Sequence, residues 1–176
     1  MTRDVDMTLL TGFGGEEPYI DALLDRYTPR IPHVARFALE NRVLLLRTDD
    51  GIGIDIALGT IPLEEEAVKR ARDVEIEPGV HLRLCSAEDL VVPKAFAGRA
   101  IDWHDVETVV SRQGASRLDW THILRQAEPL AEVKGDPEMI PRLRKLRGKR
   151  LTIAYSRGST SRPRKRIAPV GLWRMR

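Results

Sequence analysis

The sequence predicts an α+β fold, because most strand-like segments precede most helix-like segments. Short alternating or apolar stretches typical of strands are concentrated in residues 1–85, whereas residues 86–148 have the apolar periodicity of helices. This order differs from the regular alternation of strand and helix in a doubly wound sheet. We therefore expect one domain over residues 1–148, a mixed sheet with flanking helices followed by a C-terminal helical part, and then a basic tail over residues 149–176.

A change of periodicity marks the first strand and the first helix. In residues 4–10 acids alternate with apolar side chains, and the glycine-rich residues 11–15 end the strand. Residues 16–27 have acids in the first turn and a single apolar stripe, which predicts a helix. Pro29 and Pro32 prevent its continuation.

Two hairpins and another helix are predicted next. Residues 41–48 and 53–58 are strand-like and flank an Asp-Asp-Gly turn, so they predict an antiparallel hairpin. Residues 63–72 have helical composition. Residues 74–84 alternate and are interrupted by Pro-Gly, which predicts a second hairpin.

Helices are predicted from Ser86 onward. Ser86 and Asp89 have the spacing of an N-cap residue and a carboxylate at the third helical position. We therefore expect a helix over residues 87–97, in which Pro93 marks either a kink or a late start. Helical periodicity predicts three more helices, over residues 103–113, 119–133 and 137–146.

Composition excludes several classes of protein. No apolar run approaches the roughly 20 residues that a membrane-spanning helix needs, and Arg3, Asp4 and Asp6 near the N-terminus are unlike a signal peptide. We therefore predict a cytoplasmic protein without a membrane partner. The single cysteine, Cys85, excludes an intramolecular disulfide, and no Cys or His cluster predicts a zinc site. Cys85 is expected to be a buried structural thiol.

Positive charge is concentrated at the C-terminal end. Residues 149–176 contain nine Lys or Arg and no acid, whereas residues 1–148 contain 20 basic and 26 acidic residues. Without apolar periodicity, residues 149–176 are predicted to be disordered. Such a tail either contacts RNA or another polyanion, or is a solvated segment without a ligand.

Three acids are candidate metal ligands. Asp4 and Asp6 share one face of the first predicted strand, and Asp55 lies on another strand, with Ile54 and Ile56 on the opposite face. Residues i and i+2 of a strand are about 6.6 Å apart, a spacing that lets two carboxylates converge on two metal ions. Magnesium takes oxygen ligands and is commonly held by carboxylates together with substrate phosphates. We therefore predict a magnesium site around a nucleoside triphosphate.

A structural interpretation of the same acids is also open. Asp4 and Asp6 can instead lie on the solvent-exposed face of an edge strand. This interpretation is weaker for Asp55, because burying an unpaired carboxylate in an apolar strand costs several kcal/mol.

Four segments together suggest a family. They are TRDVDMTLLTG at residues 2–12, IDIALG at residues 54–59, CSAEDLVVPKAFAGR at residues 85–99 and DWHDVE at residues 102–107. In this order they resemble the AbiEii/AbiGii toxin-type nucleotidyltransferases, which are relatives of the minimal nucleotidyltransferases in the polymerase-beta-like superfamily. The resemblance covers residues 2–147 and implies a nucleotidyltransferase-like mixed sheet.

The resemblance also implies an activity. Members of this family transfer a nucleoside monophosphate from a nucleoside triphosphate to an acceptor hydroxyl, in toxin members on RNA such as the tRNA 3′ end, and an antitoxin protein is then a partner. In this scheme Asp4 and Asp6 would hold two Mg²⁺ ions. Asp55 would join one metal and activate the acceptor.

Four further residues match the family's later motifs. Lys94 resembles the helix lysine that contacts a triphosphate oxygen, a role for which a compact cation is suited. Arg99, Asp102 and Asp105 would order the site or contact the nucleotide. The structural alternatives are an exposed helix lysine for Lys94, and surface ion pairs or helix caps for the other three.

One family feature is missing, and two other functions stay open. Family members usually carry, before the Asp-x-Asp strand, a helix headed by Gly-Gly or Gly-Ser that binds the triphosphate. The chain begins at Met1, next to this strand, so we expect either that its start is misassigned or that the domain lacks that helix. A catalytically inactive domain that binds nucleotide, RNA or a partner protein is the first alternative. A metal-dependent nuclease is the second, and it is less favoured because a Glu-x-Lys pair on one strand is missing.

Overall fold

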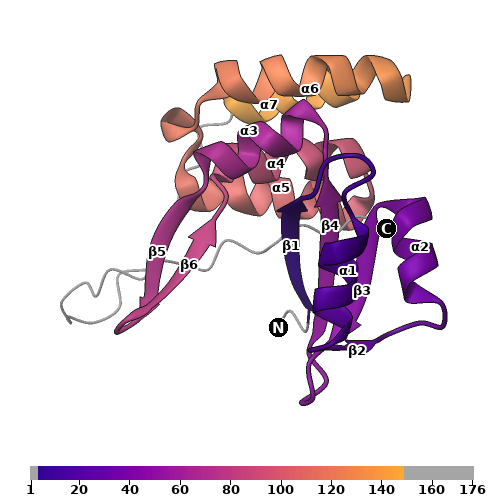
Figure 1. Cartoon of the computed structure of the whole chain (residues 1–176). Helices are drawn as coiled ribbons and strands as arrows, with labels where there is room; N and C mark the ends of the chain where they lie inside the picture. The colour runs from indigo at the N-terminus through magenta and orange to yellow at the C-terminus, as the bar shows by residue number, and fades with distance from the viewer. Residues whose placement is uncertain (1–3, 149–176) are drawn as a thin grey trace. The chain divides into compact units, whose positions relative to one another are not determined.

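The computed structural model describes residues 4–148 of the chain. These residues form two compact units, one up to Leu90 and the other from Val91 onward, and each is described by itself (Figure 1). All strands of the described residues end by Leu84 and only helices follow, which confirms the predicted α+β class. The predicted basic tail, residues 149–176, lies outside the described residues.

The first unit is built on a four-stranded mixed sheet in the order β1-β4-β3-β2. The edge strand β1 (Asp4–Leu10) pairs in parallel with β4 (Gly53–Gly59). β4 pairs antiparallel with β3 (Val43–Arg47), and β3 pairs antiparallel with the short β2 (Thr28–Pro29). The first predicted strand and the first predicted hairpin are therefore confirmed.

Two helices cover one face of this sheet, α1 (Glu17–Leu24) and α2 (Val34–Asn41), as Figure 1 shows. Their buried residues form one core cluster with residues of β3 and β4: Ile20, Val34, Ala38, Leu44, Leu46, Ile54, Ile56 and Leu58. The members from β4 alternate along the strand, so the residues between them point to the opposite face of the sheet. Burial of this apolar set therefore fixes the direction of Asp55.

The segment between α1 and β3 differs from the prediction. α1 ends at Leu24, before the predicted residue 27, and α2 lies where no element was predicted. The residues that flank α2, His33 and Arg42, have positive φ angles of 53° and 59°. Positive φ is uncommon outside glycine, so neither residue is a recognisable helix boundary in the sequence. We attribute this helix to the packing of the buried Val34 and Ala38 in the core, since no capping signal in the sequence marks its ends.

Arg42 also fastens the end of β1 to β4. Its guanidinium forms an ion pair with the buried Glu16 and donates to the carbonyl oxygen of Leu58 at 2.5 Å and to that of Gly12 at 3.1 Å. The N–H of Thr11 donates to the carbonyl oxygen of Gly59 at 3.0 Å. The loop that follows β1 is thus held to the last residues of β4.

Helix α3 (Pro62–Arg70) and the hairpin of β5 (Arg72–Glu77) and β6 (Val80–Leu84) complete the first unit. The hairpin was predicted and is confirmed by antiparallel pairing. It forms a separate two-stranded sheet, on which Ile76, Val80 and Leu82 are each almost half exposed.

The second unit is helical. α4 (Ala87–Ala97) spans the boundary between the units, and α5 (Ala100–Gln113), the short 3-10 helix η1 (Ala115–Arg117), α6 (Trp120–Lys134) and α7 (Met139–Gly148) follow. The four predicted helices are confirmed. Their buried residues include Val91, Val92, Ala95, Trp103, Val106, Val110, Ile123, Ala127, Met139 and Leu143.

The first turn of α4 has the predicted cap. The hydroxyl of Ser86 accepts a hydrogen bond from the N–H of Asp89 at 3.1 Å. Pro93 lies inside the helix, so it does not mark a late start. Cys85 follows β6 and is only partly buried, less than predicted. Among the described residues, no helix combines the length and the apolar character needed to cross a membrane.

The first testable prediction concerns the core of the first unit. Leu44→Ala should lower the free energy of unfolding by about 2–5 kcal/mol, because it opens a cavity at a fully buried position between β3 and the covering helices. Urea unfolding followed by circular dichroism measures the change. Leu39→Ala, at a position 40% exposed on α2, is the matched control and should change stability much less. Equal losses in the two variants would contradict the described core.

Candidate functional site

The register of β1 against β4 brings the three candidate metal ligands to one face of the sheet. Asp6 lies directly opposite Asp55, and Asp4 lies opposite Gly53. Residues paired across parallel strands point to the same side, as do residues i and i+2 of one strand. Asp4, Asp6 and Asp55 therefore share a surface, which we call the acidic face of β1 and β4.

Two of these three acids are buried. Asp6 is 5% exposed and Asp55 is 6% exposed, whereas the neighbouring apolar residues Val5 and Met7 are 37% and 50% exposed. β1 is an edge strand, as the structural interpretation required, but Asp6 does not lie on a solvent-exposed face. Burial of carboxylates at neighbouring positions is costly unless cations or hydrogen-bond donors compensate their charge.

Arg30 supplies such compensation. Its Nη2 donates a short hydrogen bond to Oδ1 of Asp55, and its Nη1 lies 3.8 Å from Oδ1 of Asp4. The N–H of Arg30 donates to the carbonyl oxygen of Leu45 at 3.0 Å, so the backbone of this arginine lies beside β3. Its side chain therefore crosses β3 to reach β4 and β1. Arg30 is not recognisable as a site residue in the sequence, since a single arginine after a proline carries no motif.

Gly53 provides the space in which these groups meet. A Cβ atom added to Gly53 would lie 2.3 Å from Oδ1 of Asp4 and 2.8 Å from Nη1 of Arg30. Both distances are shorter than van der Waals contact permits. The absence of a side chain at the start of β4 therefore leaves room for Asp4 and Arg30 to approach the strand in this arrangement.

The donor chemistry of the acidic face suits magnesium. Its candidate ligands are carboxylate oxygens, which a hard divalent cation prefers. Among residues 4–148, however, no group of three or more His, Cys, Asp or Glu side chains is drawn together closely enough to hold a metal ion. On the acidic face the cation in direct contact with Asp55 is the guanidinium of Arg30. The residue types fit the metal, and a metal-bound arrangement needs the carboxylates to rearrange around the ion.

The other four predicted site residues form a cluster within the second unit. Lys94 Nζ lies 2.8 Å from Oδ2 of Asp105 and 3.9 Å from Oδ1 of Asp102. The guanidinium of Arg99 donates to both carboxylate oxygens of Asp102, at 2.6 and 2.8 Å. Asp102 is fully buried, and it also accepts the N–H of Arg99 at 3.2 Å, so it caps α5. The capping and ion-pair interpretation therefore describes these contacts, although Asp102 is buried and not on the surface.

Lys94 is not an ordinary exposed helix lysine, because its side chain is only 12% exposed. Two carboxylates hold its ammonium group, and one of them, that of Asp105, is itself 41% exposed. The Lys94 ammonium is therefore held in place by these carboxylates but is not fully enclosed by the protein. The structure thus assigns Lys94 a defined orientation that the sequence did not predict.

Charge compensation sets the protonation of Asp102. Burial by itself raises the pKa of a carboxyl group, but the hydrogen bonds and the positive charge of Arg99, aided by Lys94, outweigh burial and lower the pKa of Asp102 below its ordinary value. The same hydrogen bond raises the pKa of Arg99. Both groups are therefore charged at neutral pH.

Another buried carboxylate, that of Asp89 in the first unit, has a structural role. Asp89 is 2% exposed, accepts a hydrogen bond from Arg70 at 3.0 Å and one from the Ser86 hydroxyl at 2.7 Å. The hydrogen bond to Asp89 raises the pKa of Arg70. This pair connects the end of α3 to the first turn of α4.

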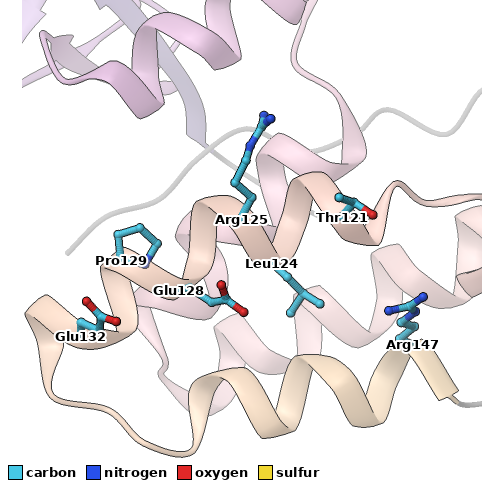
Figure 2. Close-up of a pocket in the computed structure, with 7 residues that line it drawn as sticks. All are labelled: Thr121, Leu124, Arg125, Glu128, Pro129, Glu132 and Arg147. Atoms are coloured by element: carbon cyan, nitrogen blue, oxygen red, sulfur yellow. The ribbon is translucent and has the colours of Figure 1, made fainter.

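A shallow pocket lies on α6 and α7 of the second unit, with a volume of about 510 Å³. Its lining residues are Thr121, Leu124, Arg125, Glu128, Pro129, Glu132 and Arg147. Figure 2 shows Leu124 and Glu128 on the side of α6 that faces α7, whereas Arg125 extends away from α7. Glu128 is paired with Arg144 at 3.3 Å. The pocket has mixed charge and contains none of the predicted site residues.

Comparison with known proteins does not assign a family. No protein-family model matches the chain, and no curated protein is significantly similar to it in sequence.

The second testable prediction concerns Asp102. Asp102→Asn should lower the free energy of unfolding at pH 7 by about 3 kcal/mol, the lower end of the range for a broken buried ion pair, because Arg99 is partly exposed. Chemical denaturation at a series of pH values measures the loss. Asp73→Asn is the control, since the side chain of Asp73 is 66% exposed and its ion pair with Arg83 should contribute little.

The pH dependence of this loss has a definite sign. The folded-state pKa of Asp102 is lowered, so its contribution to stability is complete above the ordinary pKa of 3.8 and disappears as the pH falls through the folded-state value. The difference between wild type and Asp102→Asn should therefore shrink below about pH 4. A difference that grows on acidification would contradict the ion pair.

Proposed function

We propose that the chain is a magnesium-dependent nucleotidyltransferase whose reaction centre is the acidic face of β1 and β4. The supporting observation is the register that places Asp6 opposite Asp55, with Asp4 on the same face. Two of these acids are buried on a small sheet whose opposite face forms the apolar core. Carboxylates are costly in such a position, and a structural role does not require three of them. Their collection on one face favours a reaction site that uses oxygen ligands.

In this proposal Asp4 and Asp6 hold the metal ions, and Asp55 joins one of these ions and also acts on the acceptor. Bound magnesium would neutralise charge on the triphosphate and align the reacting oxygens. The acceptor oxygen forms a bond to the α-phosphorus while the bond from this phosphorus to the pyrophosphate oxygen breaks, and pyrophosphate leaves. Asp55 takes the proton of the acceptor hydroxyl, which requires that its carboxylate first exchange the guanidinium of Arg30 for solvent or substrate.

By the family resemblance alone, the cluster in the second unit is also assigned a contact with nucleotide. The carboxylates of Asp102 and Asp105 orient the Lys94 ammonium, which as a compact cation is suited to a triphosphate oxygen. Asp102 acts as a positioning residue for Lys94, whose ammonium lies 3.9 Å from it, and Arg99 holds Asp102 in place at the start of α5. We also propose a tRNA acceptor and an antitoxin partner, and these two rest on the family resemblance alone.

A second candidate function is a catalytically inactive domain that binds nucleotide, RNA or a partner protein. The contact of Arg30 with Asp55 favours this inactive domain. If the guanidinium stays in place, it compensates the charge of Asp55, and the fold then needs no metal ion there. Calorimetry with nucleoside triphosphate and Mg²⁺ separates the two functions when it is combined with a transfer assay. Tight binding without turnover would favour the inactive domain.

The third testable prediction is the effect of Asp55→Asn on transfer. With labelled nucleoside triphosphates, Mg²⁺ and total tRNA, the full chain should label an acceptor, and Asp55→Asn should reduce the rate by about 100-fold or more, the contribution expected of a general base. Asp49→Asn, at an exposed position in the turn before β4, is the matched control and should leave the rate unchanged.

Two outcomes would contradict this assignment. If wild type labels no acceptor with any of the four nucleotides, the proposed activity is wrong. If Asp55→Asn transfers at the wild-type rate while circular dichroism shows an intact fold, the reaction centre lies elsewhere in the chain.

A further inference from the structure

We propose that Arg30 is a built-in counter-ion of the acidic face, which competes with divalent metal for Asp4 and Asp55 and must swing away before metal binds. This inference rests on the proposed function, because it concerns the same carboxylates, and it adds regulation of that site. It begins from the contacts of one guanidinium with residues from two strands.

The contacts of Arg30 define the competition. Its Nη2 bonds to Oδ1 of Asp55 and its Nη1 lies 3.8 Å from Oδ1 of Asp4, so one cation serves both carboxylates. A metal ligated by the same oxygen of Asp55 would bring a second positive charge to within a few ångströms of the guanidinium. Arginine cannot relieve this repulsion by losing its proton. It has to move, or the metal has to stay out.

The surroundings of Arg30 allow such a movement. Its side chain is 21% exposed, so it is not enclosed by the protein. Its backbone follows β2, a strand of only two residues at the edge of the sheet, and both β2 residues are exposed. The guanidinium can therefore leave Asp55 through side-chain rotation without disturbing the core, which lies on the other face of the sheet.

Gly53 leaves room for the counter-ion beside β4. The space that a side chain at residue 53 would fill is occupied by the carboxylate of Asp4 and by the guanidinium of Arg30. This glycine has an ordinary negative φ angle, so backbone conformation does not demand it. A side chain here would instead have to displace the flexible ends of Asp4 and Arg30.

The test uses Arg30→Gln in the full chain, with Mn²⁺ alone as the probe, its affinity measured by electron paramagnetic resonance and its effect on the melting temperature by circular dichroism. Without metal, Arg30→Gln should melt below wild type, because buried carboxylates lose their cation. It should nevertheless bind Mn²⁺ about tenfold more tightly, a change that corresponds to about 1.4 kcal/mol. A purely structural role of Arg30 predicts lower stability without tighter binding.

Matched variants complete the design. Arg36→Gln removes an arginine whose side chain is 82% exposed and paired with Glu40, and it should bind Mn²⁺ like wild type. Arg30→Lys keeps the charge but replaces a two-pronged group with a single ammonium, so its affinity should lie between those of wild type and Arg30→Gln. It also keeps the test decisive if Arg30→Gln does not fold.

The outcomes separate the inference from the proposed function. If wild type binds Mn²⁺ and neither Arg30 variant binds it more tightly, the counter-ion role is wrong and the metal site stands. If wild type and both Arg30 variants all fail to bind Mn²⁺ while remaining folded, the metal site and the counter-ion role are both wrong. If only the Arg30 variants bind Mn²⁺, the counter-ion is confirmed in its strongest form.

Discussion

The parallel register between β1 and β4 is the constraint on which the candidate site depends. It places Asp6 opposite Asp55 and Asp4 opposite Gly53, and a slip of one residue would turn the acids of β1 toward the core. The register is held at its far end by Arg42, whose guanidinium bonds to Leu58 and Glu16. The core residues of β4 fix the direction of Asp55 independently. Two separate sets of contacts, one polar and one apolar, therefore agree on a single arrangement of the acids.

In each unit of the described residues, an arginine compensates the charge of a buried aspartate. In the first unit the buried Asp55 is met by Arg30, and in the second unit the buried Asp102 is met by Arg99. The two ion pairs differ in how firmly the arginine is held. Arg99 is three residues from Asp102 and is bound through both its side chain and its backbone N–H, so the pair belongs to the start of α5. Arg30 reaches Asp55 across a neighbouring strand through its side chain alone, and such a contact can be exchanged for another cation at less cost to the fold.

Elements with strong local signals were predictable from the sequence. β1 and α4 occupy the predicted residues, because acid and apolar alternation marks the first and a serine cap marks the second. α2 was missed because its boundaries are two non-glycine residues with positive φ, a conformation that tertiary contacts impose. Periodicity predicted that Asp4 and Asp6 share a face and that Asp55 points away from Ile54 and Ile56, but the register that brings the three together comes from the pairing of β1 with β4. Arg30 was missed because its role depends on the position of β2 beside β3. Side chains that act across strands leave no pattern in the chain itself.

The hairpin of β5 and β6 has a consequence for the protein in concentrated solution. In the described residues it forms a sheet of two strands, with Ile76, Val80 and Leu82 almost half exposed. Exposed strands with apolar side chains favour pairing between molecules and hence aggregation. Glu75 and Glu77 on β5 oppose this through charge repulsion between copies, much as gatekeeper residues do, whereas the charge of Asp73 is paired with Arg83. Since salt screens such repulsion over about 8 Å at physiological ionic strength, the colloidal stability of the chain should fall as salt is added.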